Sequence, residues 1–191
     1  MDIQIDISNT ILETERLILR PWKKSDLEDF YAYASVPGVG EMAGWHHHES
    51  KDTSQKILDS FIKERNVFAV VLKQNMKAIG SSGLHPSWAN GDETYGSLTQ
   101  KEIGYVLSKA YWGMGLMPEA VGKILEYCFE TFDLEAVTVG HFKSNDQSRR
   151  VIEKCGFRFV KCDTYYAKQL DRTFDDMKYI LLREEWNARK S

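Results

Sequence analysis

The stretch from Tyr111 to Ala120, YWGMGLMPEA, has the residue types and spacing of a loop that could bind an anion. Gly113 and Gly115 let the backbone approach a ligand without an intervening side chain. Pro118 suits the first turn of a helix, where its missing N–H group costs nothing. If a strand precedes the loop and a helix follows it, several unpaired N–H groups point the same way and can hold a phosphate. A plain strand–helix connection that needs positive φ angles explains the same glycines equally well.

Other candidates for chemistry are weaker. The glycine loop lacks the third glycine of the dinucleotide fingerprint and the lysine of a P-loop, so neither motif applies. His46, His47 and His48 are consecutive and cannot easily direct three rings at one ion, and no second cluster has ligand spacing. We therefore predict no metal. Three scattered cysteines do not form a disulfide or zinc framework, and we predict that they are small buried hydrophobic residues.

The composition argues against several classes of partner. A formal charge of −3 and a pI near 6.0 give no global field that would attract nucleic acid or an anionic membrane. No apolar run has the length of a signal peptide or a transmembrane helix, so we expect a cytoplasmic protein without a membrane partner. A length of 191 residues favours one domain, which we expect to cover residues 1–191.

Hydrophobic patterning predicts the elements that position these residues. Strands are expected over residues 12–22, 67–73, 78–84, 98–108, 136–142, 157–167 and 173–182. Helices are expected near residues 27–34, over 52–65, after the glycine loop with an apolar stripe from Val121 to Phe132, and over 145–156. In the second helix Ile57, Leu58, Phe61 and Ile62 share one face. This order predicts an α/β domain with a mixed sheet.

Two motifs together resemble a known family. YWGMGLMPEA followed by NDQSRRVIEKCGF is similar to the paired motifs of the GNAT N-acetyltransferase superfamily. EIGYVL before the loop, GWHHH between the first two helices and TERLILRPW near the start add to the likeness, which narrows to the Rim-type ribosomal-protein N-terminal (alanine) acetyltransferases. The resemblance spans essentially the whole chain.

The resemblance implies a specific fold. It is an α/β (α+β) GNAT-like domain with a mixed, mostly antiparallel, seven-stranded sheet and about four flanking helices. The fourth and fifth strands, at residues 101–108 and 136–142, would splay apart and admit the pantetheine arm of acetyl-CoA. Acetyl-CoA would be the cosubstrate, and no metal is implied.

The resemblance also implies a cofactor site. Its residues would be Val106, Leu107, Trp112, Gly113, Met114, Gly115, Leu116, Met117, Asn145, Ser148 and Arg150. The family often has Gln or Arg where this chain has Ala110. We therefore expect backbone N–H groups between Trp112 and Met117 to provide most of the grip on the pyrophosphate. An N–H group near Val106 or Leu107 would face the thioester oxygen.

Two residues are candidates for catalysis. Glu102 could act as general base, directly or through water, because a partly buried carboxylate there could have a raised pKa. It could equally be an ordinary charged strand residue. Ser148 could donate to the departing thiolate, or simply bond a backbone group in the first helical turn. Many GNAT enzymes use a late-helix tyrosine for that protonation, but this chain has Ile152 there.

The acceptor side of the site has the fewest signals in the sequence. By resemblance Trp45, His46 and His48 border the acceptor site, and Trp88 is a further acceptor-side aromatic residue. We expect direct attack in a ternary complex by a primary amine, such as a protein N-terminal α-amine. A small-molecule amine acetyltransferase and a non-catalytic acyl-CoA-binding module are the alternatives. Exposed aromatic residues leave a homodimer open.

Overall fold

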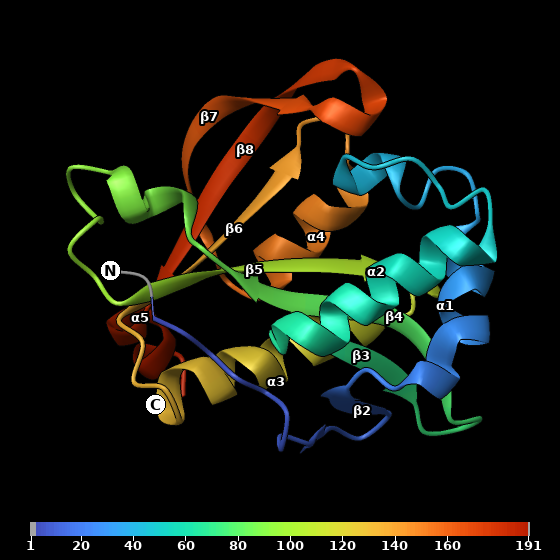
Figure 1. Cartoon of the computed structure of the whole chain (residues 1–191). Coiled ribbons are helices and arrows are strands. Elements are labelled where there is room, and N and C mark those ends of the chain that lie inside the picture. Colours follow the sequence, from blue (N-terminus) through green and yellow to red (C-terminus); the bar gives the residue numbers. More distant parts are fainter. Residues whose placement is uncertain (1–2, 191) are drawn as a thin grey trace.

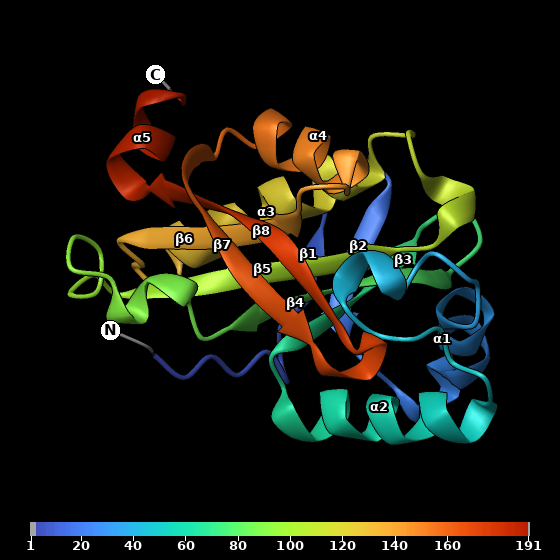
Figure 2. The ribbon, with the colours of Figure 1, turned by 90° about the horizontal axis from the view of Figure 1, so that it is seen from above.

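In the computed structural model, which describes residues 3–190, one eight-stranded sheet separates two layers of helices (Figures 1 and 2). The strands are β1 (Leu12–Glu13), β2 (Leu17–Pro21), β3 (Val67–Leu72), β4 (Lys77–His85), β5 (Gln100–Leu107), β6 (Ala136–Phe142), β7 (Arg158–Ala167) and β8 (Arg172–Leu182). The helices are α1 (Leu27–Ala34), α2 (Lys51–Glu64), α3 (Leu116–Glu130), α4 (Asp146–Lys154) and α5 (Arg183–Ala188). Short 3-10 turns are η1 (Lys24–Asp26), η2 (Glu41–Ala43), η3 (Trp88–Gly91), η4 (Lys109–Tyr111) and η5 (Lys168–Leu170).

The apolar faces of the helices assign them to opposite sides of the sheet. Ile124 of α3 and Ile152 of α4 are buried in one cluster together with Val139 of β6. Phe30 of α1 and Leu58 of α2 belong to a second cluster on the other face. β3 is buried along its whole length, as its unbroken apolar run predicted, because it contributes to both clusters. Figure 2 shows α1 and α2 on one side of the sheet and α3 and α4 on the other.

The predicted fold class is confirmed, with two differences in the number of elements. The sheet has eight strands in the described residues instead of seven, because the first predicted strand turns back on itself. Leu12 pairs antiparallel with Leu19, and the Leu17 amide donates to Thr14 Oγ1 at 2.9 Å in the intervening turn. A fifth helix, α5, follows the last strand. None of the described helices is both long enough and apolar enough to cross a bilayer.

The strands β5 and β6 form the only parallel pair among the described strands, and they separate early. They pair from Gln100 with Ala136 to Glu102 with Thr138. Beyond Glu102 each strand continues without the other, β5 to Leu107 and β6 to Phe142. The predicted splay between these strands is therefore confirmed. The separation leaves one edge of β5 open after Glu102, in the part of the strand that contains the predicted site residues Val106 and Leu107.

Candidate active site

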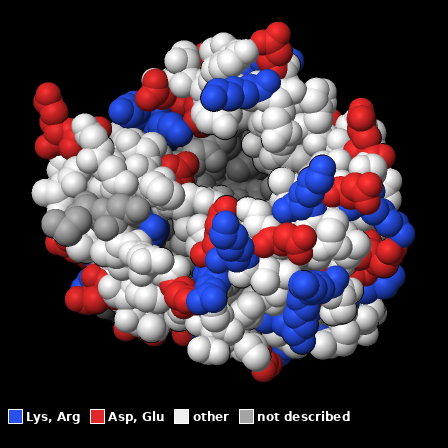
Figure 3. All heavy atoms as spheres, viewed as in Figure 1, with Lys and Arg blue, Asp and Glu red and all other residues white. Residues whose placement is uncertain are grey.

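The splay opens into a cavity of about 730 Å³, here called the first cavity. Figure 3 shows a deep hollow in the face that carries α2, with both Lys or Arg and Asp or Glu side chains on its rim. Most of the predicted site residues line the first cavity: Trp88, Glu102, Val106, Leu107, Trp112, Gly113, Gly115, Leu116, Met117, Asn145, Ser148 and Arg150. Met114 does not, since its side chain is exposed.

The glycine loop has the backbone that the sequence required. Gly113 and Gly115 have φ angles of 77° and 75°, in the left-handed region that favours glycine. Gly115 is the N-cap of α3, and Pro118 lies in its first turn, as predicted. From Gly113 to Met117 no N–H group has an acceptor within residues 3–190. These amides lie at the positive end of the α3 dipole and are available to an anion.

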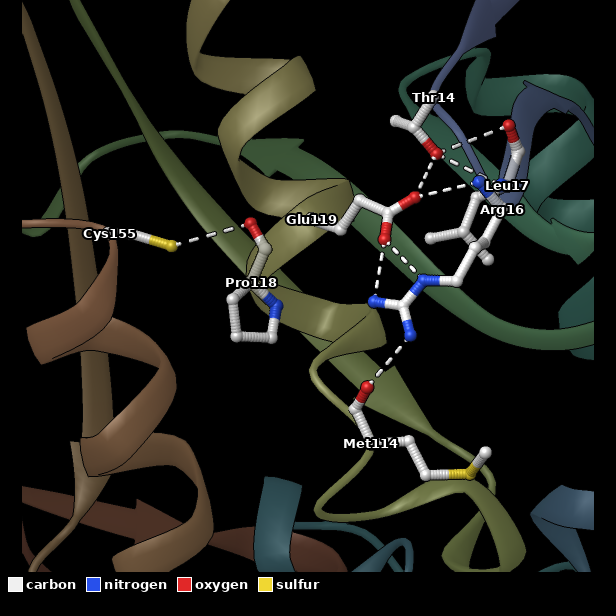
Figure 4. Close-up of polar contacts among 7 residues, drawn as sticks. All are labelled: Thr14, Arg16, Leu17, Met114, Pro118, Glu119 and Cys155. Carbon is white, nitrogen blue, oxygen red and sulfur yellow. Dashed lines mark hydrogen bonds and ion pairs between the residues drawn. The ribbon is translucent and has the colours of Figure 1, made fainter.

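A side chain from the N-terminal strand region fixes this loop from behind (Figure 4). Arg16 donates from Nη1 to the Met114 carbonyl at 3.0 Å and from Nε to Glu119 Oε2 at 2.7 Å. The other oxygen of Glu119 accepts from the Arg16 backbone N–H at 2.9 Å and from the Thr14 hydroxyl at 2.5 Å. Partial burial raises the pKa of Glu119, but these hydrogen bonds outweigh it and keep the pKa below its usual value.

This cluster, the Arg16–Glu119 clamp, was missed at the level of sequence. TERL was noted only as a family-like segment, without a role for its threonine or arginine. In the structure the clamp joins the loop carbonyl between the two glycines to the first turn of α3. The Met114 carbonyl is thereby held by Arg16, and the amides from Gly113 to Met117 have no acceptor among the described residues.

The opposite wall of the cleft is the first turn of α4. Asn145 caps this helix by accepting from the Ser148 amide at 3.1 Å, as predicted, and its Nδ2 donates to the Met42 carbonyl at 3.2 Å. The Ser148 hydroxyl lies 2.9 Å from the hydroxyl of Tyr105, which comes from β5. Arg150 is exposed on the rim of the first cavity. The cleft is therefore bridged by a hydroxyl pair.

Tyr105 is a functional candidate that sequence reasoning did not identify. Its hydroxyl also lies 3.2 Å from the Ser148 carbonyl, in the turn of α4 that precedes the buried Ile152. Burial raises the pKa of Tyr105, so the phenol keeps its proton throughout the physiological range, although the Ser148 hydrogen bond opposes this shift. Strand alternation in EIGYVL places Tyr105 on the same face as Ile103, which was the available signal.

The amides of Val106 and Leu107 are the two candidate oxyanion donors. Only one of them lies on the open edge of β5. Ser108 donates its N–H to the Ile79 carbonyl of β4 at 2.8 Å. Alternation along an antiparallel ladder then directs the backbone groups of Val106 toward β4 and those of Leu107 toward the cleft. Consistent with this direction, the Leu107 carbonyl accepts from the Trp112 indole at 2.8 Å. The Leu107 N–H is thus the amide that points into the first cavity.

Glu102 lies at the point where β5 and β6 separate. Its Oε2 accepts from the Trp88 backbone N–H at 3.0 Å. Burial raises the pKa of this carboxyl; Lys178 and the Trp88 hydrogen bond oppose the shift, while the negative charge of Asp176 adds to it. Asp176 and Lys178 form an ion pair of 2.6 Å in the same cavity. A raised pKa makes this carboxylate a better proton acceptor than an exposed one.

His85 is a further residue of the cleft that was not predicted from the sequence. It pairs with Glu102 across β4 and β5. Its ring lies over two glycines, since a Cβ at Gly83 would be 2.4 Å from His85 Nε2 and one at Gly104 would be 3.4 Å from Cδ2. Burial lowers the pKa of His85, with the positive charge of Lys101 adding to the shift and Glu64 opposing it. At neutral pH the imidazole is therefore uncharged, and its backbone lies opposite that of Glu102 in the sheet.

The acceptor-side residues divide between two cavities. Trp88 lines the first cavity, whereas Trp45, His46 and His48 line a second cavity of about 550 Å³. His47 lines the second cavity as well, but the histidines bond to different partners, and His48 Nδ1 lies 2.7 Å from Ser54 Oγ. His47 Nδ1 lies 2.8 Å from a Glu41 oxygen, and in the described part of the chain no three His, Cys, Asp or Glu side chains could share a metal ion.

The cysteines offer no nucleophile beside the cleft. Burial raises the pKa of Cys128 and of Cys155 to about 12. The Cys155 thiol donates to the Pro118 carbonyl at 3.7 Å (Figure 4). Cys162 is exposed on β7, against the prediction that all three are buried, because β7 is the edge strand and most of its side chains face solvent.

Comparison with known proteins identifies relatives over nearly the whole chain. Residues 16–158 match the family model described as an acetyltransferase (GNAT) domain. The protein p20 of Bacillus licheniformis, named an uncharacterized N-acetyltransferase, is 27% identical over 180 residues, which are 92% of this chain and 97% of p20.

Solved structures share the fold. A GNAT-family acetyltransferase of Bacillus anthracis superposes with a TM-score of 0.80 at 22% identity and covers 92% of this chain and 100% of its own. The ribosomal-protein-S5-alanine acetyltransferase of Vibrio fischeri superposes with a TM-score of 0.69 at 20% identity, over 93% of this chain and 99% of its own. At these identities the structural likeness is evidence for the fold alone.

Proposed function

The chain belongs to the GNAT acetyltransferase family and is an N-acetyltransferase, and from that premise we propose how it holds acetyl-CoA and which amine it acetylates. The observation that carries the proposal is the separation of β5 and β6 directly after Glu102. This separation brings a candidate base, an open strand edge and the unpaired amides of the glycine loop to one cavity.

The cofactor site fits a diphosphate joined to a long, uncharged arm. We assign the pyrophosphate to the amides from Gly113 to Met117, which have no acceptor in the described protein and lie at the start of α3. The arm would follow the open edge of β5, where backbone groups of Leu107 point into the cleft. Asn145 would contact it from the other wall, and Arg150 on the rim would face the ribose phosphate.

Acetyl transfer to an amine requires a neutral amine, donors for an oxyanion and a proton for the departing thiolate. Glu102, whose pKa burial raises, would remove a proton from the incoming ammonium group. The Leu107 N–H would donate to the oxygen that becomes negative. Tyr105, hydrogen-bonded to Ser148, would supply the proton that the thiolate takes. The high pKa values of Cys128 and Cys155 favour direct attack over an acetyl-cysteine intermediate.

For the acceptor we propose the α-amine of a polypeptide, of the kind acetylated by the Rim-type enzymes that the chain resembles. The Vibrio fischeri neighbour carries the name of such an enzyme, although at 20% identity it supports only the shared fold. A small-molecule amine is the second candidate, and the partly enclosed second cavity of about 550 Å³ favours it. A non-catalytic acyl-CoA-binding module is the third, and the N-acetyltransferase family to which the chain belongs argues against it.

Release of free thiol from acetyl-CoA, measured against a panel of N-terminal peptides and small amines, tests the proposed function. We expect Glu102→Gln to reduce kcat by roughly a hundredfold or more, the usual range for loss of a general base, while the Kd for acetyl-CoA stays unchanged. Glu93→Gln, the same change at an exposed position in the neighbouring loop, is the matched control. Tight acetyl-CoA binding without thiol release for any amine would establish a binding module instead.

A further inference from the structure

The second cavity adjoins the first along a short shared wall. Both are lined by Ala43, His85, Gly104, Tyr105 and Val106. An amine placed beside Glu102 could therefore extend its substituent into the second cavity without leaving the protein. The chemistry of the second cavity then selects the substituent, and this argument rests on the proposed transfer of acetyl to an amine.

Two facing glycines form the floor of the passage. Gly83 of β4 pairs with Gly104 of β5, and both line the second cavity. A side chain at either position would approach the His85 ring, to 2.4 Å at Gly83 and 3.4 Å at Gly104. Glycine inside a strand weakens it and commonly marks a close approach of another group. Here the paired glycines leave room for the imidazole of His85, which lines both cavities.

The walls of the second cavity are mainly aromatic and aliphatic. Phe30 and Phe61 lie with ring centroids 5.6 Å apart, and Phe30 meets His48 edge-on at 5.3 Å. Trp45 lies 5.1 Å from the His48 ring. Ile57 of α2 adds an aliphatic surface. Phe30 and His48 are themselves buried in this cluster, so the surface left for a ligand comes chiefly from the partly exposed Trp45, Ile57 and Phe61. Aromatic rings at such a surface favour tilted or edge-on contact with another ring.

The second cavity offers little to a second positive charge. Glu49, which is exposed, is the one carboxylate among the described residues that line it. The imidazoles of His48 and His85 have lowered pKa values because of burial, so they are uncharged at neutral pH and do not bind anions strongly either. A polyamine or aminoglycoside would carry an extra ammonium group into this cavity, where the exposed Glu49 is its one carboxylate partner among the described lining residues, and burying an ammonium group away from a close partner is unfavourable.

We propose that the second cavity binds an uncharged aromatic group attached close to the acceptor amine. The acceptor is then an arylalkylamine, or a polypeptide whose first residue is aromatic, and it is not a polyamine. The methyl group of an N-terminal alanine would leave most of the 550 Å³ unfilled. The two sources present the same aromatic ring and amine, and they differ in whether a peptide chain continues from the carbon that bears the amine.

The first test uses the unmodified protein. Thiol release is measured at saturating acetyl-CoA with 2-phenylethylamine, ethylamine and spermidine, and with two peptides that differ only in Phe or Ala at the first position. We expect the aromatic acceptor of at least one pair to have a kcat/KM roughly tenfold or more above its non-aromatic partner, as expected for burial of a ring. A preference for 2-phenylethylamine over ethylamine identifies a small arylalkylamine as the acceptor. A preference for the Phe peptide over the Ala peptide identifies a polypeptide.

The second test fills the second cavity. Ile57→Trp places a large ring on α2 where it lines the second cavity, and we expect the KM of the preferred aromatic amine to rise roughly tenfold while that of acetyl-CoA is unchanged. Ile62→Trp is the matched control, because Ile62 packs on the same helix and cluster but does not line the cavity. Thermal unfolding of both variants checks that they fold.

The outcomes separate this inference from the proposed function. Thiol release that favours spermidine, ethylamine or the alanine peptide overturns the aromatic assignment and leaves amine acetylation intact. Equal behaviour of folded Ile57→Trp and Ile62→Trp overturns it as well. If no amine releases thiol, the proposed function fails, and the assignment of the second cavity fails with it.

Discussion

The two halves of the proposed site differ in the groups that they offer to a ligand. The proposed cofactor half offers backbone groups: five consecutive residues from Gly113 to Met117 present amides without acceptors in the described protein, and Arg16 of the clamp bonds the carbonyl of the same loop. The acceptor half uses side chains, which come from the loop after α1, from α2, from β4 and β5, and from Gln169 in the turn before β8. A backbone site suits a ligand that never changes, whereas a side-chain site can be altered one residue at a time.

The largest expected effect on acetyl-CoA affinity comes from a substitution in the glycine loop, and it tests the contrast between backbone and side-chain recognition. Gly115→Val forces a β-branched residue into a φ of 75°, and we expect the backbone to rotate and the amides to lose their common direction. Losing two hydrogen bonds to a charged group weakens acetyl-CoA binding by roughly a hundredfold or more. Calorimetric titration with acetyl-CoA measures the Kd of the variant and of the unmodified protein.

Gly122→Ala is the matched control for this variant. It lies in the same helix, and a Cβ there has no neighbour within 4 Å, so we expect unchanged binding and slightly greater stability. If Gly115→Val binds acetyl-CoA as tightly as the unmodified protein, the grip does not come from these amides and the contrast between backbone and side-chain recognition is lost.

The same contrast explains what the sequence could predict. Positive φ at Gly113 and Gly115 and the cap at Asn145 are local requirements of the backbone, so residue type and spacing revealed them. The second cavity depends instead on segments that are far apart in the chain. Ile57 and Phe61 belonged to an ordinary apolar helix face, and only the packing of α2 against the sheet makes them cavity walls.

The separation of β5 and β6 could not be predicted from the pattern of residue types. Nothing in QKEIGYVL or AVTVGHF distinguishes paired from separated parallel strands, and the expectation came from family resemblance. For the same reason Tyr105 had no visible role: its hydroxyl matters because the separated strand edge faces α4. Residue types and spacing therefore predicted features of the local backbone, whereas the role proposed for Tyr105 depends on the separation of two strands.

An intermediate effect is expected at Tyr105, which lines both cavities. Tyr105→Phe removes the hydroxyl that lies 2.9 Å from Ser148 Oγ and is the proposed proton source for the thiolate. We expect kcat to fall roughly tenfold, the value of one hydrogen bond to a developing charge, with both KM values little changed. Steady-state kinetics with each substrate varied in turn measures this.

Tyr127→Phe provides the control, since it also removes a partly buried phenol hydrogen bond, of 2.9 Å to Thr10 Oγ1, but away from the first cavity. A purely structural role for Tyr105 predicts that both variants lose stability and that neither loses kcat selectively. In that case Tyr105 belongs to the wall of the site and not to its chemistry.

The smallest expected effect concerns the clamp behind the loop, and its sign follows from the pKa of Glu119. Because hydrogen bonds from Thr14 and Arg16 hold this pKa below its usual value, the ionised carboxylate is the form that stabilises the fold. The stabilisation is complete above the unfolded-state pKa of about 4.3 and is lost as the pH falls through the lower folded-state pKa. We expect Glu119→Gln to reduce the free energy of unfolding by about 1 kcal/mol at pH 7.

Urea unfolding at several pH values between 7 and 3 measures this dependence. The difference between the unmodified protein and Glu119→Gln should shrink as the pH falls, whereas Glu126→Gln, on the same helix and paired with Lys123 at its surface, should change little at any pH. Acetyl-CoA binding should weaken severalfold in Glu119→Gln but not in Glu126→Gln. A pH-dependent loss of stability without any loss of binding would mean that the clamp secures the fold, while the loop keeps its amides aligned through its two glycines alone.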